Sequence, residues 1–310
     1  MIPCGEIAAR ILGWKPYKNH DYHVKASPSN WLIGDSEYGI RLNPGEYEIT
    51  LENKLKFQAS HTEDGRRVIP NAPMDGTKVG IFGCSFTYGY GVNDQEPFPA
   101  LLQAELPTFS FVNYAVPGWG ELQSLMKLEE LVQEGSHPDL AVLVYSEVHR
   151  ERNPMATSYR SDLGLGFANS DKRINTSMKL AKFPFWDEGK IAHVSWLELY
   201  SNWWGRQSMA VVNALQTSLE SDPSENDLTF VTKEVFDRFV SVCEQNDIEL
   251  IIVNLDDSKF DRRYDIEAID VGFDFSSKKL TNRPIDRHPN PSGHEFIASK
   301  ILPKLSSVRE

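Results

Sequence analysis

Ser85 is the first residue whose type and position could do chemistry. It lies in the stretch VGIFGCSFTYGYGV, residues 79–92, where an apolar run breaks at a glycine and a serine follows a cysteine. A serine hydroxyl is a weak nucleophile that needs an adjacent base, usually a histidine oriented by a carboxylate. The segment IDRHPNPSGH offers both, because Asp286 and His288 stand two residues apart on a proline-rich loop. Together the three residues form the set that covalent acyl transfer requires.

Three other residues compete for these roles. Adjacent residues of an extended chain point to opposite sides, so Cys84 is expected to face the sheet or helix packing if Ser85 faces a cleft. We therefore interpret Cys84 as structural rather than as the nucleophile. His294 falls inside the predicted last helix and is also interpreted as structural. His149 follows an apolar strand and is expected to line the cleft.

A glycine turn in NYAVPGWG, residues 113–120, supplies a candidate for oxyanion binding. A tight turn after a strand exposes backbone N–H groups, and acyl transfer needs such donors where the oxyanion develops. Gly118 is the candidate donor. Taken alone, the same turn would be interpreted as a plain strand-to-helix connection.

These motifs resemble blocks of the SGNH (GDSL-type) hydrolase superfamily. GCSFTYG resembles the first block, in which Gly-Asp-Ser is usual, and NYAVPGWG resembles the second, with the oxyanion glycine at Gly118. DRHPN resembles the fifth block, which carries the aspartate and histidine of the triad. The resemblance covers about residues 77–305. It implies a flavodoxin-like sheet, no metal or organic cofactor, and ester hydrolysis or acyl transfer by Ser85, His288 and Asp286.

Two departures from the family pattern bear on the mechanism. Cys84 replaces the usual aspartate, which is not the triad acid in the family. The third block, normally Gly-x-Asn-Asp after a strand, is replaced by VYSEVHRERN at residues 144–153. The resemblance then leaves the third oxyanion donor to Asn153 as first choice and His149 as second. Two arginines of this run are predicted to bind an anionic substrate group or, alternatively, to form surface ion pairs: Arg150 and Arg152.

An alternation of strands and helices after residue 76 must position these side chains. Apolar strands are expected at 77–85, 110–116, 138–146 and 248–256, with helices at 97–106, 120–135, 195–215, 232–247 and 290–305. Strands of this kind with intervening helices predict an α/β fold, a flavodoxin-like parallel sheet with helices on both faces. Ligands of such sheets bind beyond the carboxyl ends of the strands.

The chain before residue 76 has a different character. Short alternating segments at 38–42, 46–53 and 54–60, separated by turn residues, predict antiparallel strands, and a helix is expected before them at 6–12. We therefore expect an N-terminal β-rich accessory region, residues 1–76, followed by an SGNH hydrolase-like α/β domain, residues 77–310.

The segment 150–194 is long for a connection and is predicted to be a lid or a substrate-selecting insertion. The predicted helix after it carries Trp196, Trp203 and Trp204, which are expected in the core. The alternative places one of these three rings, or that of Trp119, in a substrate pocket.

Composition limits the classes of partner. The chain has 310 residues, 40% of them hydrophobic, which is enough for a substantial core. A net charge of −12 disfavours binding to nucleic acid. Three scattered cysteines favour free thiols over a disulfide framework or a zinc site. The apolar runs are too short for a membrane span, and the N-terminus lacks the pattern of a signal peptide. For the sequence as given, a cytoplasmic location is expected. If a further segment precedes it, export or membrane association is expected instead.

The combined interpretation is a serine hydrolase that cleaves carboxylic esters of a lipid, carbohydrate or small molecule through a Ser-His-Asp triad. One alternative is an O-acyltransferase that acts on a polysaccharide. A second alternative is a non-catalytic binding protein on a degenerate hydrolase fold. The missing third block favours this last alternative, whereas intact Ser85, Asp286 and His288 favour an enzyme.

Overall fold

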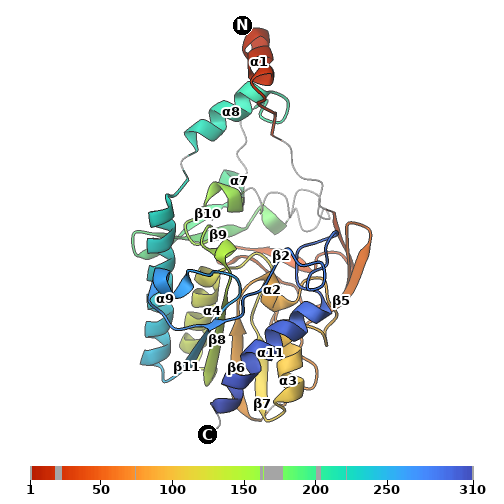
Figure 1. The fold of residues 1–310 in the computed structure, drawn as a ribbon, viewed down its shortest axis with the longest axis vertical. Coiled ribbons are helices and arrows are strands. Elements are labelled where there is room, and N and C mark those ends of the chain that lie inside the picture. Colours follow the sequence, from red (N-terminus) through yellow and green to blue (C-terminus); the bar gives the residue numbers. More distant parts are fainter. Residues whose placement is uncertain are drawn as a thin grey trace.

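A five-stranded parallel sheet forms the centre of the computed structural model, which describes residues 2–17, 23–73, 75–160, 163, 177–199, 204–220 and 222–308. The strand order is β12–β11–β8–β6–β7 (Figure 1). The strands are β6 (Thr77–Phe82), β7 (Phe109–Asn113), β8 (Leu140–Tyr145), β11 (Glu249–Asn254) and β12 (Ile269–Asp270). Neighbouring strands pair in parallel, which confirms the predicted sheet, and β12 is an addition that sequence reasoning missed.

Helices cover both faces of this sheet. On one face α4 (Glu121–Gln133) and α9 (Glu225–Gln245) pack, and on the other α3 (Phe98–Glu105) and α11 (Pro291–Ser307) pack. Successive strand residues alternate between two apolar cores, with Ile81 in the core of α3 and α11 and Phe82 in that of α4 and α9. The predicted flavodoxin-like layering is therefore confirmed. Three short helical turns complete this part: α2 (Ser85–Tyr88), η1 (Glu147–His149) and α10 (Phe260–Tyr264).

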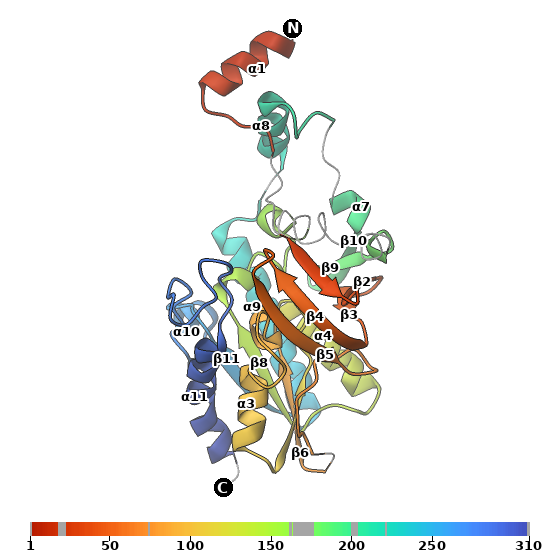
Figure 2. The ribbon, with the colours of Figure 1, turned by 90° about the vertical axis from the view of Figure 1, so that its right-hand side faces the viewer.

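The N-terminal region contributes two small antiparallel sheets. One has the order β1–β4–β5, and the other is the hairpin β2–β3. Their strands are β1 (Val24–Ser27), β2 (Leu32–Asp35), β3 (Gly39–Leu42), β4 (Gly45–Leu51) and β5 (Leu55–His61). Residues of β4, which lies in front in Figure 2, share an apolar core with residues of α4. The β-rich character is as predicted, while the division of the chain at residue 76 stays a prediction.

The region after η1 differs from its prediction. It contains a hairpin of β9 (Lys182–Asp187) and β10 (Lys190–Ser195), which was not predicted. The single helix predicted at 195–215 is wrong, because α7 (Trp196–Leu199) and α8 (Ala210–Leu219) are separated by turns that include Gly205 at φ +87°. The role of lid or insertion stays a prediction.

The tryptophans predicted on that helix do not form a core together. Trp196 is partly buried and its ring packs 5.9 Å from that of Phe183. Trp204 is 88% exposed, so its predicted core position is wrong. Trp203 lies outside the described residues. The ring of Trp119 is buried and donates Nε1–H to the carbonyl of Ile40 at 2.8 Å.

Helix α1 (Ile2–Ile11) pairs with α8 at one end of the molecule, away from the sheet (Figure 1). The Glu6 carboxylate accepts hydrogen bonds from the backbone N–H groups of Ala210 and Val211, at the start of α8. No helix of the described ranges combines the length and the apolar character that crossing a membrane requires.

Candidate active site at the carboxyl edge of the sheet

Ser85 follows strand β6 after a two-residue turn. Gly83 has a φ of +157°, and a Cβ there would lie 2.4 Å from Thr87 Oγ1, so the turn excludes other residues. Cys84 is the N-cap of α2, and its sulfur accepts a hydrogen bond from the backbone N–H of Phe86 at 3.4 Å. Ser85 is then the first residue of α2, at the carboxyl edge of the sheet, with 7% of its surface exposed.

The structure brings Ser85, His288 and Asp286 together. His288 Nε2 lies 2.8 Å from Ser85 Oγ, and His288 Nδ1 is hydrogen-bonded to Asp286 Oδ1. If Nδ1–H donates to the carboxylate, Nε2 remains as an acceptor for the serine hydroxyl. The imidazole packs between the rings of Phe86, at 5.1 Å, and Tyr90, at 4.7 Å. Nucleophile, base and orienting carboxylate are therefore arranged in one hydrogen-bonded sequence.

The loop that carries Asp286 and His288 is fixed by its own backbone. Asp286 Oδ1 accepts the backbone N–H of His288 at 2.7 Å, and the His288 carbonyl accepts the N–H of Asn282 at 3.0 Å. Asn290 caps α11 by accepting the N–H of Gly293 at 3.0 Å. These contacts hold the base in place before any substrate binds, which is what orientation in catalysis requires.

Gly118 lies in the turn between β7 and α4 with a φ of +92°, a conformation that favours glycine. Its carbonyl accepts the hydroxyl of Tyr159 at 2.7 Å, which fixes the turn. Within the described part of the chain, neither the Gly118 N–H nor the Ser85 N–H donates to an acceptor. Both backbone groups are thus free to bind an oxyanion.

The N-terminal region supports the Ser85 loop, a role that sequence reasoning missed. The Arg67 guanidinium is buried and donates to the carbonyls of Tyr88, Gly89 and Val92, directly after α2, while also pairing with Asp94 at 3.1 Å. A buried arginine that spans a loop cannot be recognised from sequence, because its acceptors are backbone carbonyls without a residue signature.

A buried histidine adds to this support. His61 Nδ1 hydrogen-bonds to the carbonyl of Asn43 at 2.7 Å, and Nε2 to the Tyr88 hydroxyl at 2.8 Å. Burial lowers the pKa of His61 to about 4, so the imidazole is neutral at neutral pH. It therefore joins the antiparallel sheet to α2 as an uncharged hydrogen-bonding group.

Neither side chain proposed as the third oxyanion donor lines the cleft. Asn153 is fully buried; its amide N–H groups donate to Glu121 and Thr232, and its Oδ1 accepts the backbone N–H of Leu122. His149 is also fully buried, so the expectation that it lines the cleft is wrong. The physical reason is that η1 turns His149 inward, against Glu121 at the start of α4.

His149 instead joins Glu121 and Cys84. Nδ1 of His149 lies 2.5 Å from Glu121 Oε1, and the imidazole also interacts with the Cys84 thiol. Burial raises the pKa of the thiol, but His149, Arg152 and the Phe86 N–H outweigh burial and lower the pKa to about 6. Burial lowers the pKa of His149, but Glu121 and Cys84 outweigh burial and raise the pKa to about 9. Cys84 is therefore buried as predicted, but it is not simply a packing residue.

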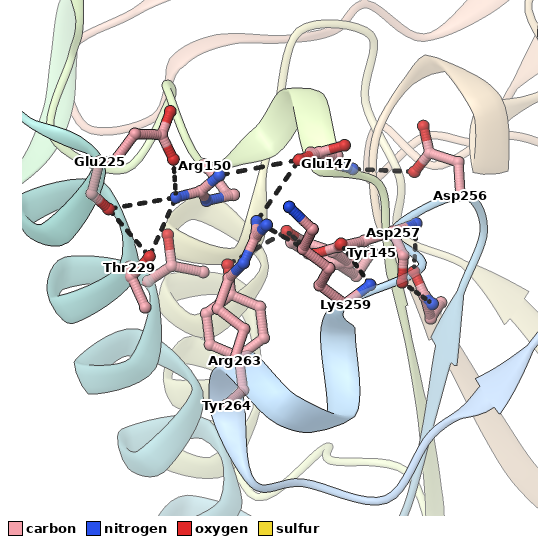
Figure 3. Close-up of polar contacts among 12 residues, drawn as sticks. Tyr145, Glu147, Arg150, Glu225, Thr229, Asp256, Asp257, Lys259, Arg263 and Tyr264 are labelled. Atoms are coloured by element: carbon pink, nitrogen blue, oxygen red, sulfur yellow. Dashed lines mark hydrogen bonds and ion pairs between the residues drawn. The ribbon is translucent and has the colours of Figure 1, made fainter.

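The two arginines of the same run are held by protein groups. Arg150 pairs with Glu225 at 2.8 Å and donates to Thr229 at 2.9 Å on α9 (Figure 3). This geometry favours the ion-pair interpretation of Arg150. Arg152 donates to the carbonyl of Trp119 and lies over the Tyr159 ring, 5.6 Å from its centroid. Arg150 thus joins the end of η1 to α9, and Arg152 joins the segment after η1 to the turn before α4.

A wider polar network anchors η1 to the ends of β8 and β11 (Figure 3). Arg263 of α10 pairs with Asp257 at 3.1 Å and with Glu147 at 3.5 Å. The backbone N–H of Glu147 donates to Asp256 at 2.9 Å. Within the described ranges, no group of three or more His, Cys, Asp or Glu side chains is placed to hold a metal ion.

Comparisons with known proteins give likeness of structure without likeness of sequence. No family model matches the chain, and no curated protein matches it by sequence. A protein from Desulfitobacterium hafniense assigned to the lipolytic G-D-S-L family aligns over 74% of this chain and 99% of its own, at 13% identity and a TM-score of 0.40. The esterase EstA from Pseudoalteromonas covers 74% and 97%, at 14% identity and a TM-score of 0.33.

A third solved structure aligns over more of the chain. It is a carbohydrate esterase whose active site is described as having divergent catalytic and non-catalytic binding functions. It covers 94% of this chain and 98% of its own, at 12% identity and a TM-score of 0.39. The structural neighbours named here are thus one lipolytic protein of the G-D-S-L family and two esterases. At these identities and TM-scores they say nothing of what this chain binds or cleaves.

Proposed function

We propose that this protein is a serine hydrolase that cleaves carboxylic esters, with Ser85 as nucleophile, His288 as base and Asp286 as the orienting carboxylate. One observation carries the proposal: Ser85 Oγ, the His288 imidazole and the Asp286 carboxylate form a continuous hydrogen-bonded sequence at the carboxyl edge of a parallel sheet. Ligands bind at that edge in open α/β sheets. The substrate is a carboxylic ester of a lipid, a carbohydrate or a small molecule.

The proposed reaction has two halves. In the first, Ser85 Oγ attacks the ester carbonyl while its proton passes to His288 Nε2, and the imidazolium then protonates the alcohol that leaves. In the second, His288 takes a proton from water, which attacks the acyl-serine and releases the carboxylic acid and the free serine. Asp286 holds the Nδ1–H tautomer and stabilises the imidazolium in both halves.

The backbone N–H groups of Ser85 and Gly118 are proposed to bind the oxyanion of each tetrahedral intermediate. Losing one such donor typically costs about 3–4 kcal/mol of barrier stabilisation. Backbone donors do not depend on residue type, so the loss of the family asparagine from the third block leaves this part of the mechanism in place. Asn153 and His149 have no part in it, because both side chains are fully buried and the Asn153 amide is hydrogen-bonded to Glu121 and Thr232.

The test uses substitutions at the two reacting residues with a matched control for each. Ser85→Ala and His288→Ala should each lower kcat for a short p-nitrophenyl ester by about 10⁴-fold or more. Ser241→Ala on α9 and His193→Ala on β10 change residues of the same types away from the site and should keep wild-type rates. A fluorophosphonate probe should label wild-type protein at Ser85, which mass spectrometry detects. The Ser85→Ala variant should not be labelled.

Three results would contradict the proposal or redirect it. A wild-type protein that neither hydrolyses the ester nor takes the probe supports a binding protein instead. Full activity in Ser85→Ala with loss in Cys84→Ala makes Cys84 the nucleophile. Labelling at Ser85 with acyl transfer to an added sugar, in place of release to water, identifies an O-acyltransferase.

A further inference from the structure

The loop of residues 88–92 contacts both residues that are proposed to react. The backbone N–H groups of Gly89 and Tyr90 donate to the carbonyl of Ser85, at 3.1 and 3.0 Å. The centroid of the Tyr90 ring lies 4.7 Å from that of the His288 imidazole. The loop therefore holds the nucleophile through its backbone and the base through an aromatic side chain.

The same loop also meets the segment that carries the base. Gly91 has a φ of +93°, and a Cβ there would lie 2.7 Å from Nδ2 of Asn282. Asn282 donates its backbone N–H to the carbonyl of His288 at 3.0 Å, and its side chain to that of Pro289 at 3.3 Å. A shift of the loop would therefore disturb His288 by two routes, through the aromatic ring and through Asn282.

Three carbonyls of this loop point toward one cation, the guanidinium of Arg67. Nη1 donates to the carbonyls of Tyr88 at 3.1 Å and Gly89 at 2.7 Å, and Nη2 donates to that of Val92 at 2.8 Å. The side chain of Arg67 is 1% exposed, and its guanidinium lies over the Tyr88 ring, 4.5 Å from the centroid. A buried carbonyl left without a donor costs about 1–3 kcal/mol. Arg67 therefore fixes the path of the loop.

The guanidinium is anchored in turn to the antiparallel sheet. Nη2 also donates to the carbonyl of Gln58 on β5 at 3.1 Å, and Nε donates to the Asp94 carboxylate at 3.2 Å. Asp94 accepts the backbone N–H of Ser60, also on β5, at 3.0 Å. Arg67 thus joins β5 to the segment after α2, and the carboxylate of Asp94 compensates its buried charge.

Only a guanidinium can make this set of contacts, because the acceptors lie on both sides of the side chain. Its five N–H groups form a planar fork, which lets Arg67 bind the loop and the strand at the same time. A lysine ammonium has the same charge on a single nitrogen. Arg67→Lys therefore keeps the charge and removes the geometry.

We propose that Arg67 is a positioning residue for the reaction. It fixes the loop of residues 88–92, and this loop holds Ser85 and His288 in their reactive arrangement. The inference rests on the proposed function of Ser85. The antiparallel sheet is then part of the catalytic unit, since it supplies the anchor for the loop.

The kinetic test compares Arg67→Lys with Arg206→Lys. Arg206 is the matched control, because it is also buried, pairs with Glu220 at 2.9 Å and lies over the ring of Tyr17, but it directly precedes α8. Arg67→Lys should lower kcat for the p-nitrophenyl ester about 100-fold with KM unchanged, as expected when reacting groups shift by about 1 Å. Arg206→Lys should keep the wild-type kcat. Wild-type kcat in Arg67→Lys, or a rise in KM that accounts for the whole loss, would overturn the proposal.

Tyr90→Leu tests the last contact and does not depend on how the arginine variants fold. Leucine removes the ring beside His288 and leaves in place the backbone carbonyls that Arg67 binds. The kcat of this variant should fall about tenfold with KM unchanged. Phe230→Leu, at an exposed aromatic residue of α9, is the control that should keep the wild-type rate. A wild-type kcat in Tyr90→Leu would mean that the loop does not hold the base.

Hydrogen exchange measures the same contacts without catalysis. In Arg67→Lys, peptides that contain the backbone N–H groups of Gly89, Tyr90 and Asn282 should exchange about tenfold faster than in wild type, because their hydrogen bonds open more often. In Arg206→Lys these peptides should exchange at the wild-type rate. Unchanged exchange around Asn282 in Arg67→Lys would refute the coupling between the loop and the base.

The measurements also separate this inference from the proposed function. Faster exchange in Arg67→Lys, together with a wild-type protein that is neither active nor labelled by the fluorophosphonate probe, leaves the coupling standing and refutes the hydrolase. Labelling of wild type at Ser85, together with wild-type kcat and exchange in Arg67→Lys, supports the hydrolase and refutes the role of Arg67.

Discussion

Two histidine–carboxylate pairs lie beside the same turn. His288 with Asp286 lies next to Ser85, and His149 with Glu121 lies near Cys84. His288 and Asp286 have side chains that are 17% and 7% exposed, whereas His149 and Glu121 are both 0% exposed. In each pair Nδ1 contacts a carboxylate, but only His288 Nε2 is hydrogen-bonded to the turn, at Ser85 Oγ, whereas His149 Nε2 has no hydrogen-bond partner among the described residues. A histidine–carboxylate pair therefore lies near each of two consecutive residues of the turn, Cys84 and Ser85.

The difference between the pairs lies in what reaches them. Ser85 is 7% exposed, and the side chain of His288, on the loop before α11, is 17% exposed. Cys84 is only 1% exposed, and His149 and Glu121 are fully buried. A catalytic base must be able to gain and lose a proton. A fully buried ion pair keeps its proton and serves to hold neighbouring groups in place. Burial thus distinguishes the set that is proposed to react, Ser85, His288 and Asp286, from the fully buried pair of His149 and Glu121.

The largest expected effect is that of Asp286→Asn. The amide cannot hold the tautomer of His288 that accepts the serine proton, so kcat should fall about 10⁴-fold with little change in stability. Steady-state kinetics on the p-nitrophenyl ester measures this fall. Asp237→Asn, in an exposed ion pair with Lys233 on α9, is the matched control and should keep the wild-type rate. A loss in Asp286→Asn below tenfold would mean that His288 works without its carboxylate.

The same carboxylate-to-amide substitution at Glu121, in the buried pair, is expected to change the free energy of unfolding first. Glu121→Gln removes the charge opposite a buried imidazolium, and breaking such a pair costs about 3–5 kcal/mol of unfolding free energy. Urea unfolding measures it. Glu129→Gln on the same helix is the control: Glu129 pairs with a partly exposed Arg238, so the cost should be about 0–1 kcal/mol. Equal costs in the two variants would show that His149 is neutral in the folded protein.

Sequence reasoning was able to place the reacting set because its members lie where strands end or on a loop before a helix. Ser85 follows an apolar strand, and Asp286 and His288 follow each other on one loop, so local patterns suffice to bring them to one edge of the sheet. Their hydrogen bonding agrees with that placement. Their catalytic roles stay a prediction for the experiments above.

The buried pair of His149 and Glu121 could not be found in this way. Glu121 is an acidic residue in the first turn of a helix, which is a common position on an exposed surface. His149 follows a strand, which predicted a place in the cleft. Only the packing of η1 against α4 turns both side chains inward, and such burial depends on residues far apart in the chain. The support from Arg67 has the same origin, because its partners are backbone carbonyls.

The smallest expected effect comes from buried histidines that lack a carboxylate. Burial lowers the pKa of His61 to about 4, and burial with Arg67 and His288 lowers that of His294 to about 3. Both folded pKa values lie below the unfolded value near 6.5, so the unfolded chain binds more protons. Their stabilisation is complete above about pH 6.5 and is lost as the pH falls toward 4 and 3, at about 1.4 kcal/mol per pH unit for each histidine.

His294→Asn isolates one of these contributions. Asparagine can still accept the backbone N–H of Phe98, which His294 Nδ1 accepts at 3.2 Å, but it does not titrate. Between pH 6 and 4 the unfolding free energy of the variant should fall less steeply than that of wild type, by about 1.4 kcal/mol per pH unit. Urea unfolding at several pH values measures both slopes. Equal slopes would mean that His294 takes up a proton without unfolding, as His149 does beside Glu121, and burial alone would then not distinguish the histidines of this protein.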